Sequence, residues 1–434
     1  MEYNKTERSY KKAAATAAVY VMIITALYLL TRLRYESGQR QFSLKAYLIS
    51  AVLVIGTGYF HSRKKGKQPA GEYLGTLLYG GGGEKKRIAY LDYLRVLATA
   101  LVIGVHIMEP AYQTIQSQGG SWRGMAVVTS IFHSSNLLFL MISGALILNG
   151  KEEPVWTFYK KRFLKVAAPC FAYYCFYCFY FYGTSAFAPD QWLKLVGSFT
   201  ANNTGITPHF WLVHVILACY LAAPFFSIMV KHMTEEQLTA LAAVIVILHF
   251  VYTYGPFGQI NFVLTTFLAS WESVFILGYF LTTRTAMKYY RLVLGAAAVS
   301  VAAIFLGVWK AADFSALLYN NAPPVIFIAA AVFLFFRKHG ETLFAVSGKA
   351  LQAAGRYSFS ILMIHWFILF EIVEKILGIN GLSFGVFGGV IIGCAAVFLL
   401  SAVFSFIYDN TVVLCLNGFL DRISETLRKC KDFK

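Results

Sequence analysis

The feature that most constrains this chain is a series of apolar stretches, because about 20 apolar residues in an α-helix span a bilayer. Of the 434 residues, 58% are apolar and 14% are charged, and the mean hydropathy is +0.59. This composition lies outside the usual range of soluble domains. We therefore predict an all-α, polytopic integral membrane protein. The twelve candidate spans cover residues 13–31, 46–61, 88–108, 125–148, 164–183, 210–230, 238–254, 262–283, 291–309, 323–336, 357–377 and 384–408.

Charge and glycine interrupt this series between the second and third spans. The segment HSRKKGKQPAGEYLGTLLYGGGGEKKR contains Pro69 and four consecutive glycines, Gly80 to Gly83. Such a composition is typical of a linker. We therefore expect four regions, which are a two-helix membrane hairpin at 1–62, a cytoplasmic linker at 63–86, a ten-helix body at 87–410 and a basic cytoplasmic tail at 411–434.

Basic residues concentrate in the connections on one side of the predicted membrane. Since an even number of spans leaves both ends on one side, the positive-inside rule predicts that both termini are cytoplasmic. The first outer connection is an exception, with four basic residues between 32 and 45. The net charge of +17 follows largely from this sidedness. It therefore does not indicate nucleic-acid binding, and we expect no nucleic-acid partner.

Ionisable residues within the spans are candidates for function, because each costs several kcal/mol near the bilayer centre. Arg95 and His106 share the third span and stand eleven positions apart. On an α-helix that spacing is about 16 Å, roughly three turns, and places both side chains near one face. Alternatively, Arg95 reaches the lipid headgroups and pairs with Asp92 three positions before it.

Other polar residues have two interpretations each. Glu109 follows His106 by three positions, so it either orients the imidazole or is solvated. Glu272 lies deeper in its span and is either the partner of a buried histidine or arginine or a hydrogen-bonded packing residue. His209 and Trp211 begin a span, where tryptophan commonly anchors the interface; a stacking platform for a sugar ring is the alternative.

The remaining polar groups in the spans are expected to serve packing. Ser143 and Gly144 form a small-residue pair, which predicts a close contact between helices. Cys175 and Cys178 form a C-x-x-C inside an aromatic run with no second ligand pair, so no metal site is predicted. The histidines assigned to packing are His133, His214, His249 and His365.

An ordered set of motifs resembles those of the membrane acyltransferase-3 family. YLDYLRVLATALVIGVHI carries the family's arginine, ten residues, then histidine at Arg95 and His106. The other motifs are NLLFLMISGALIL (136–148), YKKRFLKVAAP (159–169), HFWLVHVILACYLAAPFF (209–226) and GRYSFSILMIHWFIL (355–369). The resemblance covers the ten-span body. Two departures are that Arg162-x-x-Lys165 replaces the family's Arg-x-x-Arg, and that FHSSNLLF lacks a proline.

The resemblance implies transfer of an acyl group, usually acetyl from acetyl-CoA, to a hydroxyl of a surface glycan or lipid-linked sugar. His106 is then the general base, since imidazole titrates near neutral pH, and Glu272 is a second catalytic candidate. Cations at the cytoplasmic end of the third span would hold the coenzyme A phosphates. The expected donor-binding residues are Arg95, Asp92, Lys161, Arg162 and Lys165. The expected acceptor-binding residues are His209, Trp211 and Glu109.

The expected location is a bacterial inner membrane, with acyl-CoA, a glycan or lipid-linked sugar and membrane lipids as partners. The oligomeric state is open, and a homo-oligomer is compatible with the sequence. The main alternative is a secondary transporter or flippase, since twelve spans with both ends inside also suit that class. However, the sequence shows no repeated halves and no glycine- or proline-interrupted spans in matched positions. A non-catalytic membrane subunit is the third interpretation.

Overall fold

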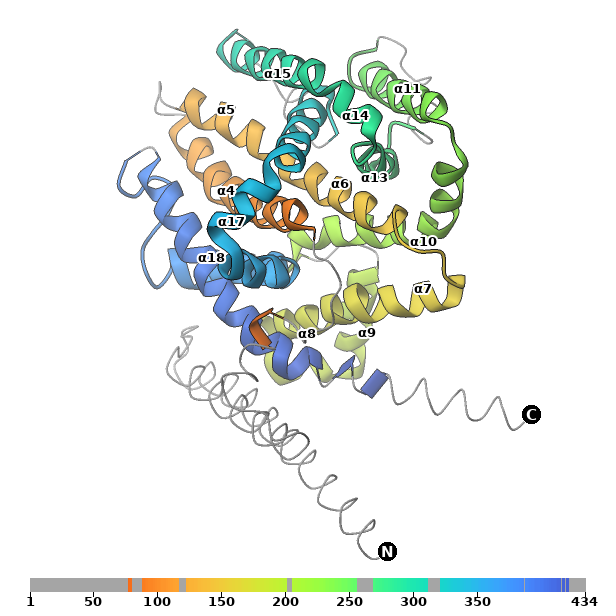
Figure 1. Cartoon of the computed structure of the whole chain (residues 1–434). Helices are drawn as coiled ribbons and strands as arrows, with labels where there is room; N and C mark the ends of the chain where they lie inside the picture. The colour runs from red at the N-terminus through yellow and green to blue at the C-terminus, as the bar shows by residue number, and fades with distance from the viewer. Residues whose placement is uncertain are drawn as a thin grey trace, which may run out of the picture. The chain divides into compact units, whose positions relative to one another are not determined.

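The computed structural model describes residues 77–79, 88–116, 122–200, 205–255, 268–310, 321–385, 387–414, 416–417 and 419–420. These residues form helices and no strand (Figure 1), as predicted for an all-α membrane protein. The predicted hairpin at 1–62 and most of the linker and tail lie outside the described residues. The structure divides into two compact units. One contains residues 85–163 and 209–402, and the other includes residues 164–208 and 403–434.

The larger unit carries most of the long helices. Its complete helices are α4 (Ala89–Gln116), α5 (Trp122–Phe132), α6 (Ser134–Leu148), α7 (Val155–Arg162), α10 (Trp211–His232), α11 (Glu235–Tyr254), α13 (Trp271–Phe280), α14 (Arg284–Lys288), α15 (Tyr290–Lys310), α17 (Pro323–Phe367) and the π-helix η4 (Ile368–Glu374). Helix α18 (Gly388–Tyr408) runs from this unit into the smaller one.

Eight helical stretches of the described residues are long and apolar enough to cross a membrane. They cover 89–111, 122–148, 208–232, 235–254, 290–310, 323–340, 348–374 and 388–408. All eight coincide with predicted spans, so the chain is a multi-pass membrane protein. The predicted span at 164–183 contains α8, which has 15 residues. The predicted span at 262–283 is described only from residue 268, and contains α13.

Helix α17 joins two predicted spans in one run of 45 residues. The backbone leaves helical geometry inside it at Gly348, with φ 2° and ψ −94°. This kink separates the stretches 323–340 and 348–374, each of which is long enough to be a span. Figure 1 shows α17 beside α4, and the two helices form extensive contacts. The helix that carries Arg95 and His106 therefore packs against the helix that carries His365.

Glycines allow close backbone contacts between α6 and α13 in the larger unit. A Cβ atom on Gly144 of α6 would lie 1.8 Å from the carbonyl oxygen of Phe275 on α13. Conversely, a Cβ on Gly278 of α13 would lie 2.1 Å from the carbonyl oxygen of Met141 on α6. Only glycine permits backbones to approach this closely. The prediction that the Ser143–Gly144 pair marks a close helix contact is confirmed.

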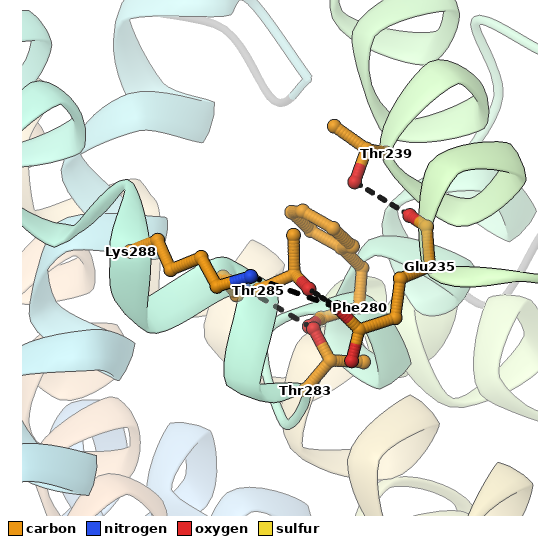
Figure 2. Close-up of polar contacts among 7 residues, drawn as sticks. Glu235, Thr239, Phe280, Thr283, Thr285 and Lys288 are labelled. Carbon is orange, nitrogen blue, oxygen red and sulfur yellow. Dashed lines mark hydrogen bonds and ion pairs between the residues drawn. The ribbon is translucent and has the colours of Figure 1, made fainter.

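A polar cluster fastens α14 to the start of α11 (Figure 2). The Thr285 hydroxyl donates to the Glu235 carboxylate, and the Lys288 amine lies 3.8 Å from the same carboxylate. Thr234 begins α11 with a capping box, in which its hydroxyl accepts from the Gln237 backbone N–H. The cluster holds the connection between α13 and α15 against α11, because α14 lies in that connection.

The smaller unit contains α8 (Ala168–Tyr182), η2 (Gly183–Phe187), α9 (Pro189–Thr200) and η5 (Asp409–Val413). Two short helices cross its boundaries. The π-helix η1 (Phe163–Ala167) lies in it except for its first residue, and the 3₁₀-helix η3 (Pro208–Phe210) lies in it only with its first residue. Helix α8 carries the aromatic run, and two of its buried tyrosines form hydrogen bonds within this unit. The Tyr173 hydroxyl donates to Asp409 at 2.9 Å, and the Tyr174 hydroxyl donates to the Leu195 carbonyl at 2.8 Å. Tyr173 and Tyr174 of the aromatic run therefore serve packing.

Candidate active site

Helix α4 carries an ion pair near its first turn. The Arg95 guanidinium donates to the Asp92 carboxylate at 2.7 Å. The Asp92 side chain is 4% exposed and that of Arg95 is 30% exposed. Gly355 of α17 packs against the Asp92 side chain, where a Cβ would come within 3.2 Å of it. The predicted pairing of Arg95 with Asp92 is therefore present, and it lies within the helix packing instead of among solvated groups.

A second arginine lies near the same end of α4. The Arg162 guanidinium stands over the rings of Phe158 and Tyr220, at 5.1 and 5.9 Å from their centroids. The Tyr220 hydroxyl forms a side-chain hydrogen bond with Ser143 and lies in electrostatic range of both Arg162 and Arg95. Two of the predicted donor-binding cations, Arg95 and Arg162, thus gather around one tyrosine.

The two predicted donor-binding lysines are placed differently. Lys161 is exposed and forms an ion pair with Glu153. Lys165 is exposed and belongs to the smaller unit, in η1. Their predicted role in donor binding stays a prediction.

At the other end of α4, His106 lines a cavity of about 260 Å³. The cavity combines imidazole, carboxylate, amide and hydroxyl groups with an indole and apolar side chains. Its lining residues are Val102, Val105, His106, Glu109, His133, Ser135, Asn136, His209, Trp211, Leu212 and Leu362. The structure therefore brings together His106 and all three residues predicted to bind the acceptor, which are His209, Trp211 and Glu109.

His106 is packed against aromatic rings of α17, which in turn contact His209 of η3. Its ring stacks on that of His365, with centroids 5.3 Å apart and planes at 24°. Trp366 meets the His106 ring edge-on at 5.0 Å and stacks on His209 at 5.6 Å. His209 and His365 are themselves in edge contact at 5.0 Å. These contacts fix the plane of the His106 ring.

Backbone carbonyls determine which nitrogen of each neighbouring histidine carries a proton, because a carbonyl oxygen only accepts. His365 donates from Nδ1 to the Leu362 carbonyl at 2.7 Å. His209 donates from Nε2 to the Met363 carbonyl at 3.0 Å. Within the described part of the chain, the structure records no hydrogen bond to the His106 ring. A nitrogen of His106 is therefore available to a hydroxyl in the cavity.

The Glu109 carboxylate and the His133 imidazole, which both line the cavity, lie beside each other. The His133 Nε2 atom lies 3.6 Å from the Glu109 carboxylate, and His133 Nδ1 donates to the Thr129 carbonyl at 2.8 Å. The sequence motivated a role for Glu109 in orienting His106, and the structure places the His133 imidazole beside the Glu109 carboxylate.

Glu272 stands in the first turn of α13 and is half-buried. It does not line the cavity described above. Its neighbour Trp271 contacts Trp211, a lining residue, with ring centroids 5.2 Å apart. The predicted catalytic role of Glu272 stays a prediction.

Sequence reasoning assigned two residues of this site, His133 and His365, to packing. His365 had a usable signal, since it lies inside the motif GRYSFSILMIHWFIL. His133 directly precedes α6, but its position in the sequence gave no sign of a partnership with α4. His365 meets His106, and His133 meets Glu109, only through the packing of α4 against other elements.

The fold and the site together define the class of this protein. It is a multi-pass α-helical membrane protein with a histidine-lined cavity among its helices. A family model described as the acyltransferase domain matches residues 88–406, well over half of the chain. The chain therefore belongs to the membrane acyltransferase-3 family, and it is a membrane acyltransferase. No curated protein and no solved structure matches it.

Proposed function

We propose that the protein transfers an acetyl group from cytoplasmic acetyl-CoA to a hydroxyl of a surface glycan or lipid-linked sugar. One observation carries the proposal. Helix α4 holds Arg95 in an ion pair with Asp92 toward one end, and it holds His106 beside the polar cavity toward the other. The family match favours an enzyme over the transporter or flippase that the number of spans also suits.

Each end of α4 has the chemistry that this reaction needs. Arg95 and Arg162 supply two cations for the phosphates of coenzyme A. The pantetheine arm would then extend about 16 Å along α4 toward His106. There His106 takes the proton of the acceptor hydroxyl as the hydroxyl oxygen attacks the thioester carbonyl. The thiolate of coenzyme A leaves and takes that proton, which returns His106 to its neutral form.

The cavity supports a sugar ring as the acceptor. Trp211 offers an aromatic surface, while His209, Glu109 and Asn136 offer hydrogen-bonding groups. This combination suits a polyhydroxylated ring, which has both apolar faces and many hydroxyls. The proposed topology places both termini in the cytoplasm and the cavity near the outer leaflet of a bacterial inner membrane, where surface glycans pass.

The test uses membranes that contain the full-length protein and acetyl-CoA labelled in its acetyl group. We expect label to enter a glycan or lipid-linked sugar fraction, and His106→Ala to lower its rate at least 100-fold, the loss typical of a missing general base. Acetyl-CoA binding and detergent-extracted yield should remain at wild-type levels. Transfer by His106→Ala at the wild-type rate would contradict the assignment of the base.

A further inference from the structure

Two arginines and one carboxylate lie near the Tyr220 side chain of α10. Asp92 pairs with Arg95 at 2.7 Å, whereas the part of the chain that the structure describes offers no ion pair to Arg162. Arg162 is half-buried, and its Nε atom is buried without a hydrogen-bond partner. An arginine is always charged, so this group of side chains carries one positive charge in excess. An uncompensated charge in a partly buried place is costly, which favours an anion there.

Contacts between α7 and α10 hold Arg162 beside Tyr220. The Tyr159 hydroxyl of α7 donates to the Leu221 carbonyl of α10 at 2.8 Å. Arg162 lies three residues after Tyr159, and its guanidinium stands over the ring of Tyr220 at 5.9 Å and over that of Phe158 at 5.1 Å. A guanidinium whose face covers aromatic rings keeps N–H groups along its edge. These groups can bind the oxygen atoms of a phosphate.

The Tyr220 hydroxyl has a partner on α6 that leaves its proton available. It forms a side-chain hydrogen bond with Ser143, and Arg162 and Arg95 both lie in electrostatic range of it. A hydroxyl has one proton to donate and two lone pairs that accept. When Ser143 donates to Tyr220, the phenolic proton remains for a third group, and the bond from Ser143 polarises it. The hydroxyl can therefore donate to an anion that both arginines attract.

The position of Tyr220 along α10 matches that of Arg95 along α4. Trp211 of α10 lines the cavity, and Tyr220 follows it by nine residues, which is about 14 Å of helix. On α4, His106 lines the cavity and Arg95 lies about 16 Å away. Each helix thus has one group at the cavity and one group that suits a phosphate about three turns away.

We propose that Tyr220 is a donor-binding residue, whose hydroxyl donates a hydrogen bond to a phosphate oxygen of coenzyme A held by Arg95 and Arg162. The proposal rests on the proposed function, which assigns these two arginines to the coenzyme A phosphates. Ser143 donates to Tyr220 and thereby orients the phenolic proton toward the phosphate. Binding involves no covalent step, and the phenol keeps its proton.

The experiment titrates coenzyme A against the purified full-length protein and its Tyr220→Phe variant. This substitution removes the hydroxyl and keeps the ring beneath Arg162. We expect the Kd to rise about 10- to 100-fold, the usual loss for one hydrogen bond to a charged group. Tyr174→Phe is the matched control, because it also removes a buried tyrosine hydroxyl, one that donates to the Leu195 carbonyl in the smaller unit. Its affinity for coenzyme A should equal that of the wild type.

A donor without phosphates separates phosphate binding from a structural role. In the transfer assay, Tyr220→Phe should raise the KM for acetyl-CoA and leave kcat near the wild-type value, because the bond is made equally in the ground and transition states. With S-acetylpantetheine, which lacks the nucleotide and every phosphate, the variant and the wild type should have the same kcat/KM. A distorted helix contact would lower transfer from both donors.

A second variant tests the contribution of Ser143. Ser143→Ala should weaken coenzyme A binding less than Tyr220→Phe does, because it removes only the group that orients the phenolic proton. The Ser143→Ala/Tyr220→Phe double variant should bind coenzyme A as Tyr220→Phe does, since Ser143 acts through Tyr220. Losses that multiply in the double variant would overturn this orienting role.

The outcomes distinguish the role of Tyr220 from the function on which it rests. A wild-type protein that binds no coenzyme A would overturn the proposed function. Wild-type binding together with an equal affinity in Tyr220→Phe would overturn the role of Tyr220 alone. A loss with S-acetylpantetheine as large as the loss with acetyl-CoA would overturn the assignment of the hydroxyl to a phosphate.

Discussion

The Arg95–Asp92 pair shows how one residue can serve both packing and binding. Asp92 is almost fully buried, and Arg95 is the charge that accompanies it. Removing one partner of a buried ion pair typically destabilises a protein by about 3–5 kcal/mol, because the other charge is left uncompensated. Loss of function in an Arg95 variant could therefore reflect unfolding, unless the charge of Asp92 is removed as well.

We predict that Arg95→Ala lowers both thermal stability and acetyl-CoA affinity, whereas Asp92→Asn/Arg95→Ala regains stability without regaining affinity. Arg95→Lys should keep part of the affinity, because it retains the charge and loses the planar guanidinium. Titration of acetyl-CoA against the purified variants, beside their melting temperatures, checks both effects. Equal affinity in the wild type and the double variant would exclude donor binding by Arg95.

At the scale of elements, the contact between α6 and α13 helps to position Ser143 and the Tyr220 hydroxyl near Arg95 of α4. Ser143 bonds to Tyr220, and the adjacent Gly144 lets the α13 backbone approach. A methyl group at Gly144 would overlap the Phe275 carbonyl, and a backbone carbonyl cannot move aside as a flexible side chain can. The helices would have to separate.

Gly144→Ala should therefore destabilise the protein by at least the 1–3 kcal/mol that is typical of overpacking. Gly295→Ala on α15 is the matched control, since no atom lies within 4 Å of its added Cβ. It should be neutral or stabilising by up to about 1 kcal/mol, the helix preference of alanine over glycine. Melting temperatures in detergent would show the contrast. Equal melting temperatures for the two variants would exclude the close contact.

At the scale of the whole molecule, burial differs among the spans. In α4, the α5–α6 stretch and the second part of α17, 61–78% of the most apolar window is buried, whereas in α11 and α15 the share is 22%. The first set carries His106, His133 and His365, while the second exposes large apolar side chains. This distribution fits a lipid boundary around a site-bearing centre, because lipid tails need no burial of apolar groups.

Val299, near the middle of α15 and 69% exposed, tests this boundary. We predict that Val299→Lys impairs membrane insertion, since a lysine at a helix centre costs about 2.5–3.5 kcal/mol on insertion scales. Val299→Leu should insert as the wild type does. The amount of each variant in the membrane fraction provides the measurement. Wild-type insertion of Val299→Lys would indicate that this face borders water or protein.

The sequence by itself determined the helical membrane class, eight of the spans that the structure describes, and the identity of Arg95 and His106 as a spaced pair. These features follow from local rules, namely the length of apolar helix that a bilayer requires and the rise of 1.5 Å per residue. The family motifs added the reaction class. Only the tertiary structure decided that His365 stacks on His106 and that Glu109 pairs with His133. Such contacts join side chains of different elements, and they depend on close approaches at residues such as Gly104, which periodicity and spacing do not encode.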